Sequence, residues 1–146
     1  MAGSIERVTE AARQAGMEIE VRRMGASTRT SEEAAEQCGC GVDQIVKSLI
    51  FQGEATDGLY LFLLQGSSRL SLAKAEVLAG EKLKRADPRL IRDRTGFAIG
   101  GVSPIGHTAP VPAFAEDALL KHDAVFRAEP GKLLAAAKAT VADIAE

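Results

Sequence analysis

The stretch Ile45-Val46-Lys47-Ser48-Leu49-Ile50-Phe51 decides how this chain folds. Its β-branched and aromatic residues, with Gly53 close behind, predict a β-strand. Because side chains alternate across a strand, Lys47 shares one face with Leu49 and Phe51, and Ser48 faces the other way. A buried ammonium group is costly without a partner. Lys47 therefore either reaches water from an edge strand or binds an anionic or carbonyl ligand in a pocket. The stretch alone does not distinguish these two alternatives.

Length and composition limit the class of protein. A chain of 146 residues suits one domain, expected over residues 1–146. The net charge of −2 argues against a general nucleic-acid binder, and the absence of Trp argues against a base-stacking platform. The N-terminus does not resemble a secretory signal, and no apolar run is long enough for a bilayer span. We expect a cytoplasmic protein without a membrane partner.

Periodicity and turn residues predict short elements in mixed order. Helices are expected at Ser4–Ala15, 30–38, Ser71–Ala79, 88–95 and Pro130–Lys138. Strands are expected at Glu18–Met24, Ile45–Phe51, Leu59–Gln65, Lys82–Ala86, Phe97–Ile99, Val111–Ala115 and Ala124–Arg127. The second and third of these strands are joined by a short Gly-containing turn, which predicts a hairpin. The pattern predicts a single compact α+β domain around a mixed sheet.

The two cysteines, Cys38 and Cys40, predict neither a disulfide nor a metal site. A bridge across one residue would be strained. A zinc site would need two further ligands, and only His107 and His122 supply imidazoles. We expect a helix end here, and no metal or cofactor.

Residues 82–94 form the most basic region of the chain, with six Lys and Arg residues. Such a region could contact phosphates. A solvated helix face is the more common explanation, so both stay open.

A second informative stretch is Gly100-Gly101-Val102-Ser103-Pro104-Ile105-Gly106-His107. Paired glycines let the backbone approach a ligand closely, and free N–H groups in such a loop can hold a carbonyl oxygen or an oxyanion. The loop matches neither a Walker A motif nor a nucleophile elbow. Alone it does not identify a site.

Together the stretches 45–51 and 100–107 resemble the YbaK/ProX (prolyl-tRNA synthetase-associated) editing-domain family. Thr28–Ala35, 43–44, 68–72 and 141–146 add to the resemblance, which covers nearly the whole chain. The resemblance implies a mixed sheet, partly closed like a barrel, that hydrolyses a wrong amino acid from a tRNA. It also implies that Lys47 is the essential lysine and that Gly100–Pro104 is the family's substrate-holding Gly-x-x-x-Pro loop.

The sequence departs from this family between Asp123 and Ala124, where an Ala/Gly-rich segment of about one strand and a turn is missing. In the family that segment helps to line the amino-acid pocket, so its absence bears on pocket size and activity. In addition, Glu116 stands where the family commonly has Asp.

The residues expected to carry the chemistry are Lys47, Gly101, Val102 and Ser103. Lys47 would hold the substrate carbonyl or the terminal ribose-phosphate. The loop N–H groups would stabilise the oxyanion, and a water or a ribose hydroxyl would attack.

Candidate substrate-binding residues are Thr28, Ser48, Arg69, Gly100, Pro104, Gly106 and His107. Thr28 and Ser48 could equally satisfy the backbone. Arg69 could steer the acceptor end or lie at the surface, and His107 could be a general base or a surface histidine.

We therefore expect a trans-editing aminoacyl-tRNA deacylase that acts on a mischarged tRNA acceptor end. The substrate would be a small amino acid on tRNA-Pro or a similar tRNA, and an aminoacyl-tRNA synthetase is a potential partner. The alternative is a non-catalytic relative that binds an aminoacyl-adenosine or docks on a synthetase.

Overall fold

The computed structural model describes residues 3–17, 31–98, 102–121 and 137–146. Its helices are α1 (Ser4–Gln14), α2 (Ser31–Cys38), α3 (Leu72–Ala79) and α4 (Pro88–Thr95), with short 3-10 helices η1 (Val42–Gln44) and η2 (Asp117–Lys121). Its strands are β1 (Val46–Gly53), β2 (Leu59–Gln65), β3 (Leu83–Arg85), β4 (Ala113–Glu116) and β5 (Ala139–Ala142).

The strands form one five-stranded mixed sheet in the order β3-β1-β2-β4-β5. The predicted β1–β2 hairpin is confirmed, with Lys47 opposite Leu64. Strand β3 is antiparallel to β1, whereas β2, β4 and β5 run parallel. The mixed α+β class is confirmed. The sheet is open among the described strands, with β3 and β5 at its edges, so the expected partial barrel closure is not found there.

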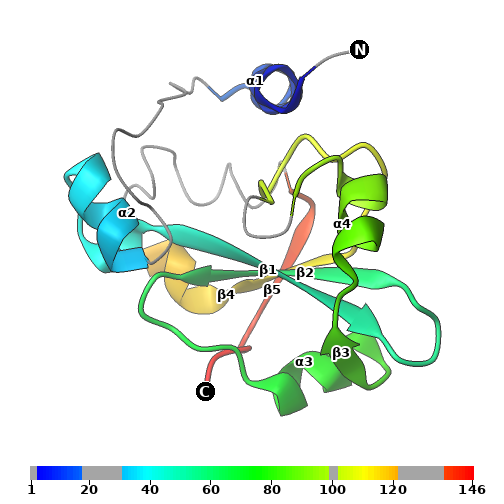
Figure 1. The fold of residues 1–146 in the computed structure, drawn as a ribbon. Helices are drawn as coiled ribbons and strands as arrows, with labels where there is room; N and C mark the ends of the chain where they lie inside the picture. The colour runs from blue at the N-terminus through cyan, green and yellow to red at the C-terminus, as the bar shows by residue number, and fades with distance from the viewer. Residues whose placement is uncertain (1–2, 18–30, 99–101, 122–136) are drawn as a thin grey trace.

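Different elements cover the two faces of the sheet (Figure 1). On one face, side chains of β1 such as Val46 and Ile50 pack with α1 and with Ile105 and Val102. On the other, Leu49 packs in a cluster that contains Phe62 and Ala75 of α3. The alternation predicted for β1 thus separates an α1-side face from an α3-side face.

Local signals in the sequence set most element boundaries. The Ser71 hydroxyl caps α3 by accepting from the Lys74 N–H at 3.3 Å, and Asp87 caps α4 ahead of Pro88. Gly80 and Gly96 then end these helices with φ values of 78° and 81°.

Two boundary predictions are wrong. Helix α1 begins at Ser4 as predicted, with Gly3 as its N-cap, but it ends at Gln14 and not at Ala15. Phe97 and Ala98 do not form a strand, because the Phe97 N–H bonds to the Thr95 hydroxyl at 3.1 Å. The elements predicted at 18–24, 124–127 and 130–136 lie outside the described residues.

Candidate active site

The ammonium group of Lys47 is half-buried and hydrogen-bonded. It donates to the main-chain carbonyl of Gly66 at 3.3 Å and to that of Ser68. These carbonyls lie in the turn after β2 and are neutral, so they hold the cation without cancelling its charge. An ammonium has three N–H donors, and two are used here. Among the residues that the structure describes, one donor is therefore left for a ligand.

The turn that holds Lys47 is fixed in its own right by Glu116, at the end of β4. One carboxylate oxygen of Glu116 accepts from the Ser68 hydroxyl at 2.6 Å, and the other accepts from the Gln65 N–H at 3.1 Å. Glu116 is only 4% exposed. A buried carboxylate needs such partners, and here they are the last residue of β2 and a residue of the turn under Lys47.

The loop from Ser103 to His107 is held by its own side chains. The Ser103 hydroxyl accepts from the Ile105 N–H at 3.2 Å, and the imidazole Nε2 of His107 lies 2.5 Å from the Ser103 carbonyl oxygen. Because a carbonyl only accepts, neutral His107 must carry its proton on Nε2. Its Nδ1 then presents a lone pair.

Burial lowers the pKa of His107 from its ordinary value, although the bond to the Ser103 carbonyl opposes this shift. The ring also meets Phe97 edge-to-face, with centroids 5.6 Å apart. His107 is thus a half-buried, neutral imidazole near pH 7, not the plain surface residue allowed by the sequence.

The main-chain N–H groups of Val102 and Ser103 have no hydrogen-bond partner within residues 3–17, 31–98, 102–121 and 137–146. They are the two described donors of the Gly-rich loop for which an oxyanion role was predicted. Unpaired N–H groups of this kind are suited to an anionic oxygen.

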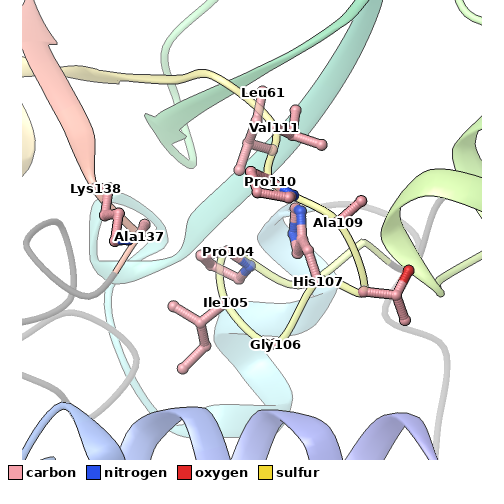
Figure 2. Close-up of a pocket in the computed structure, with 11 residues that line it drawn as sticks. Leu61, Pro104, Ile105, Gly106, His107, Ala109, Pro110, Val111, Ala137 and Lys138 are labelled. Carbon is pink, nitrogen blue, oxygen red and sulfur yellow. The ribbon is translucent and has the colours of Figure 1, made fainter.

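A pocket of about 260 Å³ lies beside this loop. Figure 2 shows His107 and Pro104 on one side and Ala137 and Lys138 across the hollow. Leu61 and Val111 add apolar lining. The pocket is small, which suits a compact side chain or ester group better than a nucleotide.

The described residues do not bring Lys47 and the loop into contact. Lys47 lies on the face of β1 that it shares with Leu49, toward α3. Val102 and Ile105 pack against the opposite face. Lys47 does not line the pocket.

Of the other predicted site residues, three have a described place in the structure and three do not. Ser48 lies on the loop side of β1 and is half-buried, and Arg69 is exposed next to Ser68. Gly106 lines the pocket. Thr28, Gly100 and Gly101 lie outside the described residues.

The sequence analysis did not identify two residues that contact the candidate site: one fixes the turn under Lys47, and the other bonds the loop beside the pocket. Glu116 was noted only as a change from Asp, although a carboxylate at the end of an apolar strand is a signal for a buried polar partner. Arg7 of α1 reaches the carbonyl of Gly106 at 3.3 Å, and nothing in its local sequence indicated this.

Within the described ranges, no group of three or more His, Cys, Asp or Glu residues could hold a metal ion. The same residues include no helix long and apolar enough to cross a membrane.

Comparisons with known proteins agree on one family. The model of the aminoacyl-tRNA editing domain matches residues 26–145. A crystal structure of a proposed trans-editing enzyme for prolyl tRNA synthetase superposes with a TM-score of 0.86 at 44% identity, covering 100% of this chain and 99% of the other.

Sequence relatives point the same way. The uncharacterized protein YwhH of Bacillus subtilis is 32% identical over 111 residues, which are 76% of this chain and 70% of YwhH. The proline–tRNA ligase of Thermosipho melanesiensis is 37% identical over 81 residues, 55% of this chain but only 14% of the ligase. The family match spans most of the chain, and we conclude that the chain belongs to the aminoacyl-tRNA editing domain family.

Proposed function

We propose that this protein is a trans-editing deacylase that hydrolyses the ester bond of a mischarged tRNA in the cytoplasm. The observation that carries the proposal is an editing domain with a half-buried lysine, whose ammonium uses two of its three hydrogen-bond donors within the described part of the chain. The similarity to a trans-editing enzyme for prolyl tRNA synthetase favours a small amino acid on tRNA-Pro.

In this proposal Lys47 binds the acceptor end as a fixed charge. Its position on the α3-side face, away from the loop, favours the terminal ribose-phosphate over the ester carbonyl. The acceptor end of a tRNA is a single-stranded chain, so its phosphates and its terminal ester can contact different parts of the domain.

The ester would sit where the pocket meets the loop at Pro104, next to Ser103. The N–H groups of Val102 and Ser103, with that of Gly101, would stabilise the oxyanion, and such donors are worth about 3–4 kcal/mol each. A water attacks the carbonyl carbon and passes its proton to Nδ1 of His107, because attack by the free ribose hydroxyl would only move the acyl group to the neighbouring ribose oxygen. The acyl–oxygen bond then breaks, and the proton returns to the leaving ribose oxygen.

A non-catalytic binding module is the second candidate. It is favoured by the separation of Lys47 from the loop across the sheet, since no described constellation joins a nucleophile, a base and a cation. This relative would bind an aminoacyl-adenosine or dock on a synthetase without turnover.

A deacylation assay on a panel of mischarged tRNAs distinguishes these functions. Mass spectrometry of the protein during turnover tests the mechanism as well. The proposal predicts no acyl adduct, because Ser103 is assigned a backbone donor only. A covalent acyl group on Ser103 would contradict it.

A further inference from the structure

Helix α1 lies against the pocket loop, and its contacts converge on Arg7. The guanidinium donates to the carbonyl of Gly96 at 2.6 Å through one terminal nitrogen and to the carbonyl of Gly106 at 3.3 Å through Nε. These two carbonyls lie ten positions apart along the chain, at the start and near the end of the loop. One side chain therefore ties both ends together.

The same guanidinium also fixes an aromatic pair. Its carbon lies 5.2 Å from the centroid of the Phe97 ring, within the range of a cation–π contact. Phe97 in turn meets the imidazole of His107 edge-to-face. A series of contacts thus runs from Arg7 through Phe97 to His107, and His107 lines the pocket.

Two glycines make room for this arrangement. Gly106 has φ of 81°, and a Cβ there would lie 3.0 Å from main-chain atoms of Arg7 and Val8. Gly96 also has φ of 81°, and a Cβ there would lie 2.5 Å from the Arg7 guanidinium. A side chain at either position would be strained; at Gly106 it would push against the backbone of α1, and at Gly96 it would displace the Arg7 guanidinium.

Helix α1 lies outside residues 26–145, the part of the chain that the family model matches. The packing of α1 on the core is ordinary: Val8 and Ala12 belong to the α1-side cluster. The bonds of Arg7 to loop carbonyls are separate from these apolar contacts. They act on the loop itself.

We propose that Arg7 is a positioning residue for the substrate loop. It fixes the carbonyls of Gly96 and Gly106 relative to each other and sets the place of His107 at the pocket. Hydrogen bonds from a charged donor are stronger than neutral ones, and a two-point tie from a planar guanidinium fixes orientation as well as distance. The effect of Arg7 on catalysis rests on the proposed deacylase function, whereas its effect on the loop conformation does not.

Hydrogen exchange measured by mass spectrometry tests the tie directly, with Arg7→Leu and Arg7→Lys. We expect the hydrogen-bonded amides of Ile105, Thr108 and Ala109 to exchange at least about tenfold faster in both variants, while amides of β1 and β2 keep their rates. Lysine keeps the charge but cannot bond both carbonyls as arginine does, so it should not rescue the loop. Arg13→Ala is the matched control, because Arg13 lies on the same helix, is exposed and pairs with Glu10.

Equal acceleration in the loop and in β1–β2 would show general destabilisation and overturn the proposal. Unchanged loop exchange would overturn it as well. In the deacylation assay, both Arg7 variants should lower kcat more than they raise KM, and a purely KM effect would contradict positioning of the loop. If the wild-type protein does not hydrolyse mischarged tRNA, the proposed function fails, and the exchange rates alone still decide whether Arg7 holds the loop.

Discussion

The hydroxyl of Ser68 donates a hydrogen bond of 2.6 Å to the buried carboxylate of Glu116, from a position 48 residues earlier in the chain. The carbonyl of the same Ser68 accepts from Lys47. Glu116 therefore sets the position of Lys47 through the turn between them, although the two side chains make no described ion pair with each other.

Replacing Glu116 should destabilise the fold. Glu116→Ala leaves the Gln65 N–H and the Ser68 hydroxyl without their acceptor in a buried place, which costs about 1–3 kcal/mol. Urea denaturation measures this change in the free energy of unfolding. The control is Glu54→Ala, at an exposed residue, which should change it by less than about 0.5 kcal/mol. Equal effects at the two positions would refute the role given to Glu116.

Removing the Lys47 ammonium should affect activity more than stability. Lys47→Ala deprives the carbonyls of Gly66, which is buried, and Ser68, which is half-buried, of a charged donor, which costs about 1 kcal/mol where water replaces it. Steady-state kinetics on a mischarged tRNA should show kcat/KM reduced by about ten- to a hundredfold, with most of the change in KM. A variant with near wild-type kcat/KM would exclude Lys47 from substrate binding.

The basic region gives a test of phosphate binding. Arg85, Arg89 and Arg92 are exposed and make no ion pair within the described part of the chain, whereas Lys84 lies 3.5 Å from Asp57. If Arg89 and Arg92 bind phosphates, changing both to Gln should reduce the slope of log affinity against log salt by roughly 0.7–0.9 for each phosphate that is no longer neutralised. Arg13→Gln should leave the slope unchanged. If the double variant also keeps the wild-type slope, these arginines form a solvated face.

His107 should make stability depend on pH. Burial holds its pKa in the folded protein below the unfolded value, so the unfolded chain binds more protons between these two pKa values. The contribution of His107 to stability is therefore present above the unfolded pKa of about 6.5 and is lost as the pH falls through that window. The free energy of unfolding, measured from pH 7.5 to 5, should decrease more in wild type than in His107→Gln. Parallel curves would show that the imidazole titrates as it does in the unfolded chain.

Much of the fold could be predicted because its signals are local. Gly80, Gly96 and Pro88 mark helix ends by their backbone preferences alone. The apolar alternation of β1 predicted the correct faces. Phe97 was misassigned because a single bond from its N–H to the Thr95 hydroxyl overrode its strand propensity.

The site was harder to predict because its contacts join distant parts of the chain. No local pattern shows that Arg7 meets the carbonyl of Gly106, 99 residues away, or that Glu116 bonds Ser68. The sequence placed Lys47 and the loop in one site by resemblance. In the structure, the Lys47 side chain lies on the α3-side face of the sheet, and the loop packs against the α1-side face.

Release of amino acid from mischarged tRNA-Pro by the purified wild-type protein tests the central claim most directly. The account predicts hydrolysis well above the spontaneous rate for a small non-cognate amino acid, and little for correctly charged prolyl-tRNA. Selectivity of this kind rests on about 1–3 kcal/mol per methylene, or roughly 10- to 200-fold. Binding of the same mischarged tRNA with no hydrolysis above background would contradict the account and assign the chain to the non-catalytic binding modules.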